Sequence, residues 1–127
     1  MIQANELRLG NMVLVYNQIV EVLGIDEDKI ETSAYFYDGM GCTGGWLKEA
    51  DPIILTPEIL RECGFFKENN IHPEHWDMKD YKLTLSEVND GFEVYASECT
   101  IGKAFKYLHQ LQNVYYILTG EELEIDL

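Results

Sequence analysis

The sequence predicts an α+β fold, because strand-like segments joined by tight turns fill its first half and its second half adds helical stretches. The chain has 127 residues, of which 46% are apolar, so it has the length of one domain and can form a core. Such short connections favour antiparallel pairing. We predict a single domain, residues 1–127, in which residues 1–55 form a small SH3-like, barrel-like curled sheet and residues 56–127 form an α+β half.

Apolar segments rich in strand formers, separated by turn residues, predict the first half. The expected strands are residues 12–16, 19–25 and 30–37, and the expected turns are Gly10-Asn11, Asn17-Gln18 and residues 26–29. Four glycines within residues 38–45 predict a loop, and residues 52–55 follow as a short extended piece.

A short helix is predicted after Thr56, which suits the N-cap, with Pro57 at the first helical position and Glu58 in the first turn. Ile59, Leu60 and Cys63 have spacings that fit one face of this helix, and Gly64 ends it.

A β-hairpin and a long helix complete the predicted second half. Residues 81–88 alternate with period two, Asn89-Asp90-Gly91 forms a hairpin turn, and residues 92–96 return. The helix is predicted over residues 104–119, and its core face follows a spacing of three and four residues. That face comprises Ala104, Leu108, Leu111, Tyr115 and Leu118, widened by Phe105, Tyr107, Val114 and Ile117. The tail after Gly120 is expected to be a last strand or a docked end.

The net charge of −14 argues against direct binding to nucleic acid, because phosphate binders present basic surfaces. Residues 1–55 carry 9 acids and 3 bases, and residues 56–127 carry 14 acids and 6 bases, so neither half is basic. No apolar run approaches the roughly 20 residues of a membrane-spanning helix. The N-terminus does not resemble a signal peptide, so we expect a cytoplasmic protein with three free thiols, no membrane association and no cofactor.

Three segments carry a family resemblance: residues 106–116 running into residues 118–123, the opening residues 5–11, and residues 52–60 ending in Gly64-Phe65. They resemble an uncharacterised family of short proteins from gut-bacterial genomes, often in phage or mobile-element surroundings. The stretch 67–80 has no counterpart in that family. The resemblance implies a phage-related accessory protein and assigns no activity.

The best candidate for an interaction face is the polar side of the last helix, because residues three and four apart share a face. This face comprises His109, Gln110, Gln112, Asn113 and Tyr116. The alternative is that these polar groups bond to neighbouring backbone.

Two weaker candidates involve metal binding and thiol chemistry. His72 and His75, with Cys63 or Asp80 as further ligands, have a spacing that suits zinc on a helix, but the spacing is common and a polar surface loop is the favoured interpretation. Cys42 lies in the glycine-rich loop, where neighbouring acids would disfavour a thiolate. We therefore assign no catalytic, cofactor-binding or metal-binding residue.

These observations leave three functional hypotheses open. The first is a non-enzymatic accessory protein that acts through protein–protein contact. The second is an acidic decoy that mimics nucleic acid and inhibits a basic host protein, suggested by the acids of residues 26–31 and 121–126. The third is a small metal-dependent enzyme that uses His72 and His75. The sequence does not specify the oligomeric state.

Overall fold

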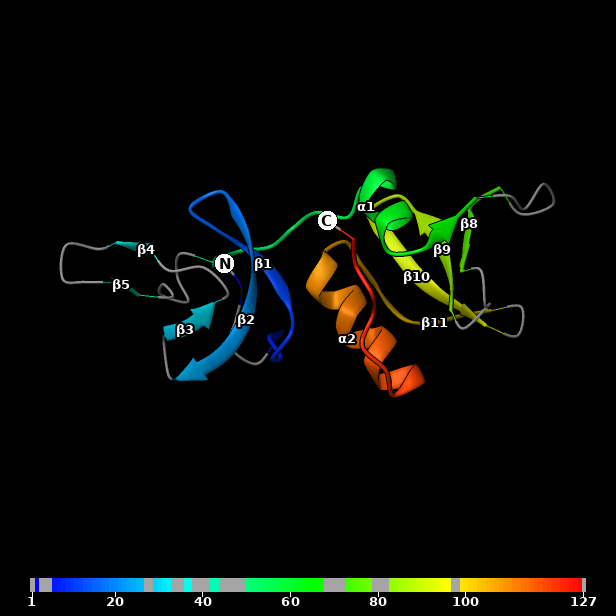
Figure 1. Cartoon of the computed structure of the whole chain (residues 1–127). Coiled ribbons are helices and arrows are strands. Elements are labelled where there is room, and N and C mark those ends of the chain that lie inside the picture. Colours follow the sequence, from blue (N-terminus) through cyan, green and yellow to red (C-terminus); the bar gives the residue numbers. More distant parts are fainter. Residues whose placement is uncertain are drawn as a thin grey trace. The chain divides into compact units, whose positions relative to one another are not determined.

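The computed structural model confirms the α+β class, with antiparallel sheets and two helices in its described part (Figure 1). The structure describes residues 2, 6–26, 29–32, 36–37, 42–43, 50–67, 73–78, 83–96 and 99–126. The chain divides into two compact units, which are described separately. Unit 1 is Met1–Ile53 with Tyr107–Asn113, and unit 2 is Ile54–Lys106 with Val114–Leu127. The first division falls two residues before the predicted junction of the two halves.

Unit 1 is built on a four-stranded antiparallel sheet with the strand order β3-β2-β1-β6. Its strands are β1 (Met12–Val15), β2 (Gln18–Asp26), β3 (Lys29–Thr32) and β6 (Ala50–Asp51). A separate pair joins β4 (Phe36–Tyr37) to β5 (Cys42–Thr43). Antiparallel pairing of the strands in residues 1–55 agrees with the prediction, and closure into an SH3-like barrel stays a prediction.

The turn between β1 and β2 lies at Tyr16 and Asn17, whose φ angles are 50° and 64°. Positive φ at both central residues is the signature of the type I′ hairpin turn, whose twist matches that of the flanking strands. Val15 therefore pairs with Gln18. The predicted break at Asn17-Gln18 was wrong by one residue, because tyrosine is an uncommon residue for this conformation.

The predictions for residues 30–37 and 38–45 need correction. The described residues of the expected single strand pair with two different partners, since β3 pairs with β2 and β4 pairs with β5. The expected loop contains β5, because Cys42 and Thr43 pair with Tyr37 and Phe36.

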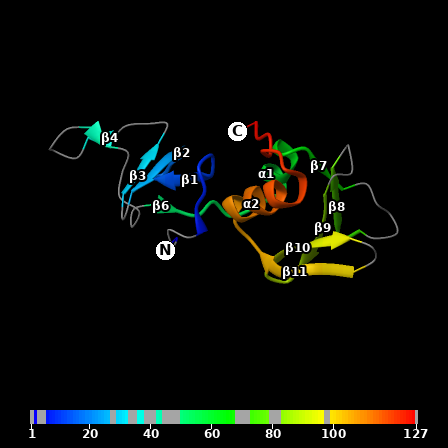
Figure 2. The ribbon, with the colours of Figure 1, turned by 90° about the horizontal axis from the view of Figure 1, so that it is seen from below.

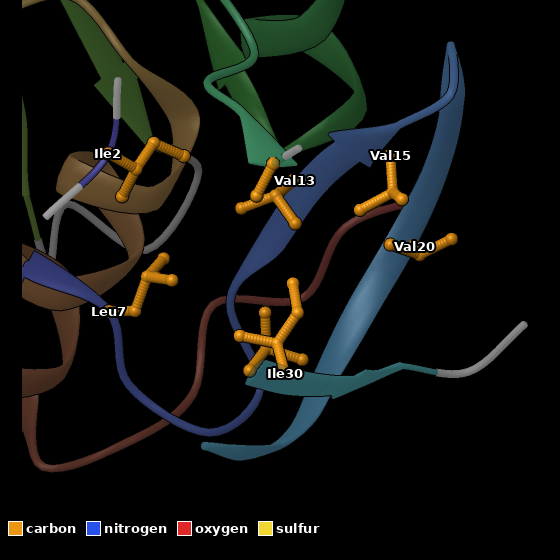
Figure 3. Close-up of a cluster of buried hydrophobic side chains, with 8 residues drawn as sticks. Ile2, Leu7, Val13, Val15, Val20 and Ile30 are labelled. Atoms are coloured by element: carbon orange, nitrogen blue, oxygen red, sulfur yellow. The ribbon is translucent and has the colours of Figure 1, made fainter. Parts of the chain in front are cut away.

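The core of unit 1 contains alternate side chains of β1 and β2 (Figure 3). The cluster comprises Ile2, Leu7, Val13, Val15, Val20, Val22, Ile30 and Ala50. The four valines are at most 1% exposed. Burying each such side chain contributes about 1.5–3 kcal/mol relative to leaving it in water. The opposite face of β2 presents Ile19 and Leu23, which are 47% and 51% exposed.

Unit 2 is built on a five-stranded antiparallel sheet with the order β11-β10-β9-β8-β7. Its strands are β7 (Phe65–Phe66), β8 (His75–Met78), β9 (Thr84–Val88), β10 (Gly91–Ala96) and β11 (Cys99–Phe105). Each strand pairs with the next along the chain, so the sheet is a meander. Helix α1 (Pro57–Glu62) and the second half of α2 (Leu108–Thr119) lie on one side of it (Figure 2).

The start of α1 and the β9–β10 hairpin confirm two local predictions. The Thr56 hydroxyl accepts a hydrogen bond from the Ile59 amide at 3.2 Å, as an N-cap does. Leu60 and Cys63 are buried on the predicted face. Asn89 and Asp90 turn the chain between β9 and β10, and Val88 pairs with Gly91.

The last helix begins later than predicted, at Leu108 instead of Ala104. Phe105 belongs to β11, where it pairs with Phe92, and both rings are buried. The predicted core face is wrong at both ends, because Ala104 is exposed and Ile117 and Leu118 are 77% and 53% exposed. Five consecutive apolar residues, 114–118, spread over more of a helix than one buried face can cover.

The tail after α2 is a docked end rather than a strand. Residues 122–126 form no strand, Leu123 is buried, and the Asp126 amide donates a hydrogen bond to the Glu62 carbonyl at 3.1 Å. The chain thus runs back from the end of α2 to the end of α1 (Figure 1).

The hairpin glycine Gly91 offers a test of the unit 2 sheet. Its φ is +142°, and an added Cβ would overlap the backbone carbonyl of Phe105, so Gly91→Ala must shift β11. Gly102→Ala is the matched control, because Gly102 also has a positive φ but open space around it. We expect the free energy of unfolding, measured by urea denaturation, to fall by about 1–2 kcal/mol in the control and by more in Gly91→Ala. Equal losses of stability in the two variants would contradict the close approach of Gly91 to the Phe105 carbonyl.

Candidate functional site

Gln112, on the first half of α2, bonds to the backbone at the start of β1 within unit 1. Its side-chain oxygen accepts from the Met12 amide at 2.8 Å, and its side-chain nitrogen donates to the Gly10 carbonyl at 3.0 Å. The side chain is buried at 3% exposure. Gln112 therefore satisfies one donor and one acceptor that would otherwise cost free energy to bury.

Asn113 makes a second set of bonds to the same segment. Its oxygen accepts from Asn11 Nδ2 at 2.8 Å and from Arg8 Nε at 3.2 Å, and its nitrogen donates to the Glu6 carbonyl at 2.9 Å. Asn11 is fully buried and also accepts from the Arg8 amide at 2.7 Å. We call Arg8, Asn11, Gln112 and Asn113 the polar clasp. It attaches residues 107–113 to the segment before β1.

His109 lies one helical turn before the clasp and is only 1% exposed. Neither ring nitrogen has a hydrogen-bond partner among the described residues. Its ring stacks on that of Tyr107, with ring centres 5.9 Å apart and planes 9° apart. Burial lowers the pKa of His109, and the charge of Glu6 acts in the opposite direction.

The five residues of the predicted interaction face are therefore divided between different environments. Gln112 and Asn113 bond to neighbouring backbone, and His109 is buried. Gln110 is half-buried and accepts from the Tyr107 amide at 3.2 Å. Tyr116 belongs to unit 2 and is 42% exposed. All five residues are described by the structure, and of these five only Tyr116 is exposed.

Unit 2 contains a cavity of about 740 Å³ between the end of α1, strand β8, helix α2 and the tail. Its carboxylates belong to Glu62, Glu121, Glu122, Glu124 and Asp126, and its apolar walls to Cys63, Met78, Tyr115 and Ile125. No Lys or Arg occurs among the described residues that line it. The arrangement suits a group that combines positive charge with an apolar stem.

Three large apolar side chains, Tyr116, Ile117 and Leu118, are exposed directly after the cavity residue Tyr115. Leu118 lies three residues after Tyr115, so it is on the same side of α2 one turn further on. Tyr116 and Ile117 project from other sides of the helix, about 100° and about 200° around it from Tyr115, so the three exposed side chains extend the apolar surface from the cavity around the end of α2. We call Tyr116, Ile117, Leu118 and the cavity carboxylates the docking surface.

Cys63 is a free, buried thiol in the wall of this cavity. Burial, reinforced by the charge of Glu62, raises its pKa from 9.0 to about 12. A thiol held protonated is a poor nucleophile, so Cys63 forms part of the wall rather than a reactive group.

The predicted metal ligands are not brought together by the described residues. His75 lies in strand β8, not on a helix, is 4% exposed, and packs against Tyr95 with ring centres 4.2 Å apart. His72 and Asp80 lie outside the described residues, as does the side chain of Cys42. Within the described part, no group of three or more His, Cys, Asp or Glu side chains is placed to hold a metal ion.

Sequence reasoning identified the acidic tail but missed its partners in the cavity. Glu62 and Asp126 are 64 positions apart, and no local pattern links them. The exposure of Ile117 and Leu118 had a signal in the sequence, namely the five consecutive apolar residues 114–118. The role of Asn11 had no signal in the sequence, where Gly10-Asn11 was interpreted as a turn.

Comparisons with models of known protein families, with curated protein sequences and with solved structures find no match to this chain. The resemblance to a gut-bacterial and phage family therefore stays a prediction. None of the helices in the described part of the chain is long and apolar enough to cross a membrane.

The polar clasp predicts a specific sensitivity at Gln112. Gln112→Met keeps helix propensity but leaves the Met12 amide and the Gly10 carbonyl without their partner, which we expect to cost unit 1 about 2–4 kcal/mol. Gln110→Met is the control, with an expected cost below about 1 kcal/mol because the bond that Gln110 accepts from the Tyr107 amide lies at a half-buried site. Urea denaturation followed by the NMR signals of β1 and β2 measures both, and equal costs would contradict the clasp.

The environment of Cys63 predicts protection from thiol reagents. We expect no labelling of Cys63 by maleimide near pH 7.5 in the folded protein and complete labelling in urea, with peptide mass spectrometry separating it from Cys42 and Cys99. Because its pKa is higher in the folded protein, stability should also fall as the pH rises above 9.0 towards 12. Rapid labelling of the folded protein would contradict the burial.

Proposed function

We propose that this protein is a non-enzymatic accessory protein, of phage or mobile-element type and cytoplasmic, that acts by binding another protein through the docking surface of unit 2. The observation that carries the proposal is the exposure of Tyr116, Ile117 and Leu118 beside an acidic cavity. Apolar side chains supply free energy of association when a partner covers them. The carboxylates add selectivity for the charge of that partner.

The partner expected from this chemistry presents an apolar groove for the end of α2, with Lys or Arg side chains near it. A basic side chain can pack its apolar stem against Met78, Tyr115 and Ile125 while its charged end lies beside the cavity carboxylates. The polar clasp is a weaker candidate surface, because its amides already bond within unit 1.

The acidic decoy remains the alternative proposal, and the gathering of five carboxylates around one cavity favours it. A decoy depends on charge, so its affinity for a basic partner falls steeply with ionic strength. A contact based on the apolar end of α2 retains most of its affinity when the ionic strength is raised. The metal-dependent enzyme with His72 and His75 stays a prediction that no described observation favours.

The test compares Ile117→Gln/Leu118→Gln with Ile19→Thr. The double variant removes exposed apolar area on α2 and keeps helix propensity, whereas the control removes it from the outer face of β2, where threonine suits a strand. A partner is first isolated from lysate of the native host with the wild-type protein. Its affinity for each variant is then measured by titration calorimetry. We expect at least about tenfold weaker binding for the double variant and wild-type affinity for the control.

The same titration at low and moderately high salt separates the two proposals. A small salt effect combined with sensitivity to Ile117→Gln/Leu118→Gln supports apolar docking. Binding that is indifferent to this double variant but lost at high salt supports the decoy. Equal weakening by the double variant and by Ile19→Thr would contradict the docking surface.

A further inference from the structure

His109 occupies an unusual place for a titratable side chain. It is almost fully buried in the first turn of α2, and its two ring nitrogens lack partners among the described residues. One turn further on, Gln112 and Asn113 form the polar clasp with residues 6–12. The neutral imidazole can be tolerated there as a stacked ring against Tyr107, but the imidazolium would carry a charge with two unpaired donors.

We propose that His109 is a pH-sensitive release for the polar clasp, so that its protonation detaches residues 107–113 from the segment before β1. Detachment frees the side-chain amides of Gln112 and Asn113, which are held within unit 1 when His109 is neutral. The proposal concerns unit 1 alone and does not rest on the docking surface of unit 2.

Desolvation of the buried ring, which the charge of Glu6 only partly offsets, explains why release follows protonation. Glu6, on the segment before β1, attracts a charged imidazole, whereas Arg8 on the same segment carries positive charge and bonds to Asn113 one turn away. Tyr107, just before α2, contributes an aromatic ring that stacks on the His109 ring. Burial outweighs the effect of Glu6 and lowers the pKa of His109. In the attached state the ring therefore stays neutral at pH values where a solvated imidazole gains a proton.

The direction of the pH effect follows from this difference. Above pH 6.5, the ordinary histidine value, both states are neutral and the clasp has its full stability. As the pH falls below that value, the detached state binds a proton that the attached state does not, so detachment becomes more favourable by up to about tenfold per pH unit.

Amide hydrogen exchange read by NMR on the isolated full-length protein tests the proposal. The Met12 amide, which donates to Gln112, reports the clasp directly. We expect its protection factor, normalised to the intrinsic exchange rate at each pH, to fall by up to about tenfold per unit below pH 6.5. The amides of β9 and β10 should show no such change, and the His109 imidazole signals should titrate below 6.5.

Two variants make the assignment specific. His109→Leu should keep the Met12 protection factor constant with pH, whereas His75→Gln, which alters a buried histidine of unit 2, should leave its pH dependence unchanged. A constant Met12 protection factor in the wild-type protein overturns the proposal without any variant. A pH dependence that survives His109→Leu, or disappears in His75→Gln, also overturns it.

Discussion

The structure of unit 1 depends on one constraint, the need of backbone polar groups at the start of β1 for partners. The Met12 amide and the Gly10 and Glu6 carbonyls find them in the side chains of Gln112 and Asn113. These partners are about a hundred positions away in the sequence. An unpaired buried group costs about 1–3 kcal/mol, so the clasp contributes to stability on the scale that decides whether a small unit folds. The first half of the last helix thus belongs to the first unit.

Those features of the fold that depend on neighbours in the sequence were predictable. Thr56 and Pro57 specify the start of α1, and Asn89-Asp90-Gly91 specifies a hairpin, because caps and turns are local chemistry. The start of the last helix was not predictable in this way. Phe105 fits the apolar face of a helix as well as it fits β11, and its pairing with Phe92 decides between them. Tertiary contacts overrode the local pattern there.

The same distinction applies to the candidate site. The sequence shows the acidic tail and the polar residues of the last helix, and both do take part in the sites described. It does not show that the tail returns to Glu62, or that Gln112 and Asn113 bond to the backbone of residues 6–12. The sequence left two interpretations of the polar residues on the helix, a surface for a partner or bonds to neighbouring backbone, and the second is correct for Gln112 and Asn113. Helical spacing identifies which residues share a face, but not whether that face is covered.

The acidic character of unit 2 also bears on the exposure of its apolar helix end. Side chains such as Ile117 and Leu118 would promote self-association in a chain of low charge. A second copy would bring the carboxylates of two cavities together, and a net charge of −14 adds repulsion at longer range. The same charges would attract the basic partner of the proposed function. On that proposal, charge and apolar area together favour an unlike partner over a second copy of this chain, which is how an interface gains specificity as well as affinity.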